Sequence, residues 1–183
     1  MKTNNNIIRN TFIIPLETNV FLEKLQYAAN VLKSQMKILK SFVDNKENIS
    51  TLEMSRFVEN EIMKNNCTPT FKNYKGFPEA VCISVNKQLV HGIPSDYKLQ
   101  EGDIITFDFG ITFEDAMVDS ARTFEYGETK YKKLVETTEL CLLNAINSIE
   151  LNKRLGSIGY AIHKTATKEG FKVIQHYGGH GIS

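Results

Sequence analysis

Two stretches with alternating side chains constrain the fold of this chain more than any other feature. Hydrophobic residues fill every second position of 104–111, namely Ile105, Phe107, Phe109 and Ile111. Residues 116–124 also have a period of two, which predicts strands that each bury one face. Only a few residues around 113–115 separate the stretches, so we expect them to pair as an antiparallel hairpin.

The same hairpin carries two acidic residues that point to chemistry. Asp108 lies on the face opposite the hydrophobic residues. If the hairpin folds about residues 113 and 114, paired residue numbers sum to 227, and Asp108 lies directly opposite Asp119, with Cβ atoms roughly 4.5–5.5 Å apart. Two carboxylates this close repel each other unless a proton or cation lies between them, which favours a divalent metal site. The alternative is that one aspartate faces water at a sheet edge. Glu114 and Asp115 are expected to be solvated turn residues.

Helical periodicity occupies both ends of the chain. The helical segments are 20–39, with Thr18 or Asn19 as N-cap, then 51–65, 131–149 and 157–169. Ser50 and Glu53 form a capping-box pattern at the start of the second helix. Further strands are expected at 80–85, 88–93 and 171–176. This order predicts an α+β fold with a largely antiparallel sheet.

Histidines supply the second group of candidate site residues. His180 lies between glycines, which leave its imidazole uncrowded, and neutral imidazole is the commonest metal ligand in proteins. His91 precedes Gly92 and could orient a substrate amide or carry a proton. Taken singly, each of these histidines would more often be structural than functional. His163 is expected to be exposed on a helix, and His176 to be structural or close to the site.

Composition excludes several classes of protein. The 183 residues are 42% hydrophobic and carry a formal net charge of +1, which suits one globular domain and argues against a nucleic-acid binder. Cys67, Cys82 and Cys141 have no CxxC spacing, which argues against disulfides or a cysteine zinc site. Neither a signal peptide nor a membrane span is apparent. A cytoplasmic protein is therefore expected.

Several short motifs, in order and with similar spacing, resemble type I methionine aminopeptidase. They are 74–78 (Tyr-Lys-Gly-Phe-Pro), 82–86 (Cys-Ile-Ser-Val-Asn), 90–94 (Val-His-Gly-Ile-Pro), 99–103 (Leu-Gln-Glu-Gly-Asp), the Asp108/Asp119 pair and 179–182 (Gly-His-Gly-Ile). Each motif is weak alone, but the set is specific. The resemblance covers residues 15–183 as a catalytic domain and leaves 1–14 as an N-terminal extension.

The resemblance implies the pita-bread fold and a cytoplasmic metallohydrolase that removes the initiator methionine from nascent chains. Its site holds two divalent metal ions, with Co, Mn, Fe or Zn as candidates. By position, Asp108, Asp119 and His180 correspond to metal ligands, and His91 to a catalytic residue at the scissile amide. Tyr74, Phe77 and Phe71 correspond to the substrate pocket that receives methionine. A monomer, possible contact with the ribosome, and no nucleic-acid or membrane partner are further implications.

The chain also departs from that family. The family's two glutamate ligands follow the His-Gly-Ile segment, whereas this sequence stops at Ser183. We therefore expect an incomplete second half of the fold, and turnover of less than about one per cent of a full-length enzyme, since catalytic groups act as a unit. Two alternatives stay open: a non-catalytic peptide- or protein-binding module with the same fold, and a related Xaa-Pro aminopeptidase, which the short N-terminal region disfavours.

Overall fold

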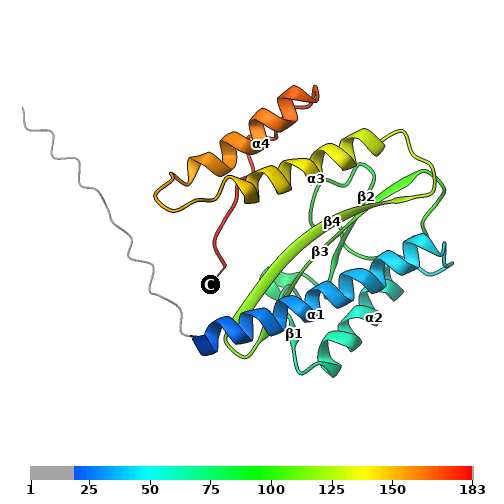
Figure 1. Ribbon diagram of the computed structural model, residues 1–183. Coiled ribbons are helices and arrows are strands. Elements are labelled where there is room, and N and C mark those ends of the chain that lie inside the picture. Colours follow the sequence, from blue (N-terminus) through cyan, green and yellow to red (C-terminus); the bar gives the residue numbers. More distant parts are fainter. Residues whose placement is uncertain (1–18, 183) are drawn as a thin grey trace, which may run out of the picture.

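The described part of the chain joins a small antiparallel sheet to four helices (Figure 1). The computed structural model describes residues 19–182, so the predicted extension at 1–14 and the candidate N-cap Thr18 lie outside the described residues. The helices are α1 (Asn19–Asp44), α2 (Thr51–Lys64), α3 (Lys132–Asn147) and α4 (Gly156–Lys168), with one 3₁₀ turn, η1 (Tyr74–Gly76). The strands are β1 (Thr68–Pro69), β2 (Cys82–Val85), β3 (Asp103–Phe113) and β4 (Ala116–Tyr126).

The predicted hairpin is confirmed, but its predicted register is wrong by two residues. Phe113 pairs with Ala116, so Glu114 and Asp115 alone form the turn, and Asp119 lies opposite Gly110 rather than opposite Asp108. Glu114 takes a left-handed φ of 53°, and both turn side chains are exposed, as expected. Lys24 of α1 holds the turn with ion pairs of 2.7 Å to Glu114 and 2.8 Å to Asp115.

The error of two residues leaves every side chain on its predicted face, because successive residues of a strand alternate between faces. Ile105, Phe107, Phe109 and Ile111 are all fully buried. Their partners in the core come from the inner faces of α1 and α2, including Leu39, Met36, Met54, Val58 and Ile62. Burial of each such side chain stabilises the fold by roughly 1.5–3 kcal/mol.

The capping box at the start of α2 is confirmed. The Oγ of Ser50 accepts the N–H of Glu53 at 3.2 Å, and Oε2 of Glu53 accepts the N–H of Ser50 at 2.7 Å. Each side chain thereby satisfies an amide that the first helical turn leaves without a partner. The helix ends at its C-cap, Asn65.

Two predicted strands, at 88–93 and 171–176, are wrong. Residues 88–93 instead turn back along β2, where the N–H of Ile83 donates to the carbonyl of Gly92 at 2.9 Å. The left-handed φ of 55° at His91 breaks an extended run. Residues 171–176 have no partner strand within 19–182, and an unpaired segment cannot form a ladder.

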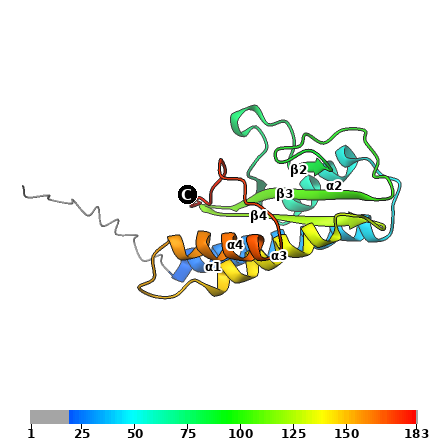
Figure 2. The same ribbon diagram turned by 90° about the horizontal axis from the view of Figure 1, so that it is seen from above.

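The C-terminal helices are packed differently from α1 and α2. Helices α3 and α4 pack mainly against each other, beside the hairpin (Figure 1), and Figure 2 shows the segment after α4 rising past the strands. Many large hydrophobic side chains of these two helices and of the segment between them stay exposed, including Leu140, Leu143, Ile146, Ile149, Leu151, Leu155 and Tyr160. Within residues 19–182, none of the helices has the length and hydropathy that crossing a membrane requires.

Candidate metal centre

The candidate centre is built on Asp108 of β3 and Asp119 of β4. They are diagonal neighbours on the face of the hairpin turned away from the core, and their side chains are hydrogen-bonded. Burial, followed by the nearby Asp119 carboxylate, raises the pKa of Asp108 to about 6. Burial also raises the pKa of Asp119. Without a cation, this pair therefore holds a proton more tightly than ordinary carboxyl groups do.

Cys82 is a neighbour of the carboxylate pair that the sequence did not single out. It lies opposite Asp108 across the β2–β3 ladder and is buried. Burial and then the charges of Asp108 and Asp119 raise the pKa of its thiol to about 12. The thiol is therefore neutral near pH 7. Its place beside Asp108 follows from the β2–β3 register, which residue periodicity does not reveal.

His91 lies near Asp108. Its charge acts to lower the pKa of Asp108, against the larger effects of burial and Asp119. The residue is exposed and has a left-handed backbone with a φ of 55°. A residue with a side chain rarely adopts this conformation without support from its surroundings, and such residues are found often at functional sites.

His180 is placed less firmly than the sequence predicted. Its charge influences both Asp108 and Asp119, yet its Nδ1 lies 2.9 Å from the carbonyl oxygen of Gly181 and the residue is exposed. Within residues 19–182, no three His, Cys, Asp or Glu side chains form a group able to hold a metal ion. His180 therefore stays a predicted ligand, on a segment that forms no strand but lies near enough to the two aspartates for its charge to act on both.

The donor chemistry of the pair nevertheless suits a divalent cation. Asp103, on the same strand, gives the contrast: its carboxylate accepts bonds from Asn86 at 2.7 Å and from Tyr97 and Gln100 at 2.8 Å each. These three hydrogen bonds give the Asp103 carboxylate a structural role. Asp108 is bonded to another carboxyl group instead, and hard divalent cations prefer such oxygen pairs.

The three predicted pocket aromatics differ in burial. The ring of Phe71 packs against the core and lies over Gly110, where an added Cβ would come within 3.1 Å of it. Gly110 is the partner of Asp119, so Phe71 is close to the candidate centre. Phe77 is half-buried, whereas Tyr74 is exposed, with the Lys75 ammonium over its ring.

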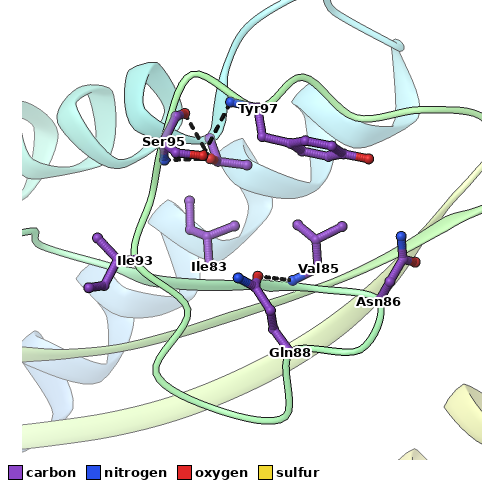
Figure 3. A pocket seen from close by; sticks show the side chains of 8 residues that line it. Ile83, Val85, Asn86, Gln88, Ile93, Ser95 and Tyr97 are labelled. Carbon is purple, nitrogen blue, oxygen red and sulfur yellow. Dashed lines mark hydrogen bonds between the residues drawn. The ribbon is translucent and has the colours of Figure 1, made fainter.

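Two cavities lie apart from the carboxylates. The smaller, of about 260 Å³, lies between β2, the start of α2 and the 86–97 segment (Figure 3), and Tyr97, Ser95 and Gln88 supply its polar wall. The larger, of about 740 Å³, is bounded by the hairpin, α3, α4 and residues 171–179. Asp108 and Asp119 line neither of them.

Comparison with known proteins decides the family. The sequence model described as metallopeptidase family M24 matches residues 23–183. The chain belongs to metallopeptidase family M24. Among its M24 relatives, the methionine aminopeptidase of Mycoplasma capricolum is 37% identical over 173 residues, which are 93% of this chain and 68% of the relative. That of Clostridium perfringens is 34% identical with the same coverage.

Solved M24 structures agree with this assignment. The methionine aminopeptidase of Rickettsia prowazekii superposes with a TM-score of 0.85 at 31% identity, over 93% of this chain and 68% of that one. The Thermotoga maritima enzyme gives 0.85 at 32% identity, over 93% and 69%. The predicted pita-bread fold is thereby confirmed. A Xaa-Pro dipeptidase from Bacillus anthracis, at 21% identity and a TM-score of 0.71 over 85% of this chain and 42% of that one, shares the fold alone.

Proposed function

We propose that this chain takes part in the metal-dependent removal of N-terminal methionine from peptides. One observation carries the proposal: Asp108 and Asp119 meet on adjacent strands, on the face away from the core, in a member of a metallopeptidase family. The curated relatives named above as methionine aminopeptidases supply the substrate class. Initiator methionine of nascent chains in the cytoplasm is the substrate that follows.

The residues proposed to hold the metal are Asp108, Asp119 and His180, with two divalent ions per site and Co, Mn, Fe or Zn as candidates. Bound divalent cations supply an acidified water as nucleophile and polarise the scissile carbonyl. The pair must lose its shared proton to bind a cation, so binding is expected to release protons and to weaken as the pH falls below about 6.

The remaining roles fall to residues around the pair. His91 is proposed to donate a hydrogen bond to the substrate beside the scissile amide, since it lies near Asp108 and is open to solvent. Phe71, Phe77 and Tyr74 are proposed to line the apolar pocket for the methionine side chain. Phe71 has the firmest support, because its ring lies over Gly110 beside Asp119.

A second candidate function is a non-catalytic peptide-binding module. The observation that favours it is that residues 19–182 provide no complete group of three metal ligands. A module of this kind would bind a methionine-led peptide without cleaving it and without needing a metal.

The deciding experiment measures metal binding and cleavage on the same sample. Titration calorimetry with Mn²⁺ or Co²⁺ and release of methionine from Met-Ala-Ser are compared for the wild-type chain, D108N and, as a control distant from the site, D115N. We expect metal-dependent release that D108N abolishes and D115N retains. Peptide binding without metal uptake or release would support the module instead, and preferential cleavage of a Xaa-Pro peptide would overturn the methionine specificity.

A further inference from the structure

The backbone next to His91 is held by an unusual pair of contacts. The N–H of Gly92 donates to the Oγ of Ser84 at 3.1 Å, and the carbonyl of Gly92 accepts the N–H of Ile83 at 2.9 Å. The N–H and the carbonyl of Gly92 are therefore hydrogen-bonded to two consecutive residues of β2. We call this arrangement of Ile83, Ser84 and Gly92 the Gly92 clamp.

Glycine is required at the centre of the clamp. A Cβ at position 92 would lie 2.7 Å from the Cα of Ser84 and closer still to the carbonyl oxygen of Ile83. Both are backbone atoms that cannot rotate away. The close approach brings Gly92 within reach of the Ser84 hydroxyl, so the glycine and the serine act together.

Ser84 lies where it can fix the site. It is only 4% exposed, and it is separated by one residue from Cys82, which pairs with Asp108. Side chains two apart on a strand share a face, so the Ser84 hydroxyl lies on the face of β2 that continues the carboxylate face of β3. The clamp thus ties the segment that carries His91 to the strand adjoining the metal-ligand candidates.

The clamp also explains how His91 keeps a strained backbone. A left-handed φ of 55° at a histidine is unfavourable by itself, and it persists only where neighbouring contacts enforce it. The residue that follows is bonded at both its N–H and its carbonyl, which leaves the chain little freedom to relax. His91 is thereby kept near Asp108.

We infer that Ser84 is a positioning residue that holds His91 near Asp108 through the Gly92 amide. The catalytic significance of this role rests on the function proposed above, whereas the clamp itself does not. Ser84 touches neither substrate nor metal in this arrangement and acts only through the backbone.

The test is NMR on the full chain at pH 7, with S84A, the hydroxyl-retaining variant S84T, and S55A as matched control. Ser55 of α2 is another buried serine, whose hydroxyl donates to Glu79 at 3.5 Å rather than to the segment that carries His91. In S84A we expect the Gly92 amide to exchange about fivefold faster relative to the Ile105 amide, since one hydrogen bond is lost. The His91 ring signals should shift at the same time, S84T should restore both readouts, and S55A should change neither.

Unchanged Gly92 exchange and His91 signals in S84A, or equal changes in S55A, would overturn the inference. If S84A does not fold, G92A gives an independent test, because the added methyl group must push the segment away from Ile83 while Ser84 stays intact. His91 signals that stay at their wild-type positions in G92A would also overturn it. A failure of the proposed function is recognised separately, as a lack of metal-dependent release of methionine from Met-Ala-Ser by the wild-type chain.

Discussion

Similar hydrophobic side chains are packed differently in two regions of the molecule. One region runs from α1 to β4, and the other runs from α3 to residue 182. Leu39 of α1 is fully buried, whereas Leu143 of α3 is half exposed, although both lie on helices with an apolar stripe. The large hydrophobic cluster draws its buried members from the first region only. An apolar stripe on a helix is therefore buried only where a second apolar surface packs against it.

The surface that α1 uses is the core face of the β3–β4 hairpin, reinforced by α2. Helices α3 and α4 pack mainly against each other. The cavity of about 740 Å³ beside them is lined largely by apolar side chains such as Leu134, Val135 and Ile162. The chain spans about two thirds of the length of the M24 relatives that it matches. Contiguous exposed apolar surface of this kind favours association with other surfaces.

The largest effect should come from matched Leu→Ala substitutions in the two regions. L39A removes a fully buried side chain and is expected to lower the free energy of unfolding by about 2–5 kcal/mol, because it leaves a cavity. L151A removes a side chain that is 95% exposed, and its effect should stay within about 0.5 kcal/mol. Urea unfolding followed by circular dichroism measures both. Equal losses would show that the C-terminal region is packed as tightly as the core.

Hydrogen exchange should separate the regions without any substitution. Amides of β3, such as those of Phe107 and Phe109, should exchange only through global unfolding. Amides of α4 should open locally, with a free energy at least about 2 kcal/mol smaller, because few buried contacts hold that helix. Uniform protection across both regions would contradict the difference argued here.

Within the well-packed region, the carboxylate face is expected to be a source of instability. The pKa of Asp108 is about 6 in the fold against 3.8 for an ordinary aspartate, so the folded state binds the proton more tightly. Stability should therefore fall as the pH rises from about 4 to 6 and stay lower above that range.

D108N should remove this effect and stabilise the chain at pH 7 in the presence of EDTA, by about 1 kcal/mol after allowance for partial solvation. D103N is the matched control and should destabilise, because the Asp103 carboxylate accepts three hydrogen bonds. Thermal unfolding from pH 4 to 8 measures both variants. A loss of stability in D108N at pH 7 would refute the expectation.

The smallest effect concerns how α2 and α4 begin. S50A removes the capping box of α2 and should cost about 1 kcal/mol. At α4 the N-cap is Leu155, whose side chain makes no capping hydrogen bond, so L155S should stabilise by a few tenths, about 0.3 kcal/mol. The gain is small because Leu155 already has helical backbone angles, which suit a capping side chain poorly. Urea midpoints of the two variants should move in opposite directions.

Much of the candidate site was predictable because its faces follow from a period of two. That period placed Asp108 opposite the core whichever register formed, and it placed Asp119 on the same outer face. Their exact pairing depends on whether the turn uses residues 113–114 or 114–115. The sequence does not decide between these turns, because it lacks a strong hairpin signal such as Asn-Gly.

What the sequence determined by itself is local: the four helices, the capping box at Ser50, the faces of the hairpin, and the motifs that mark an M24 peptidase. Only the tertiary structure decided which segments lie together, including Cys82 against Asp108 and Gly92 against β2. The physical reason is that helix periodicity and capping depend on neighbours within a few residues. Strand pairing depends instead on contacts between distant segments, and those form only where a free edge is available.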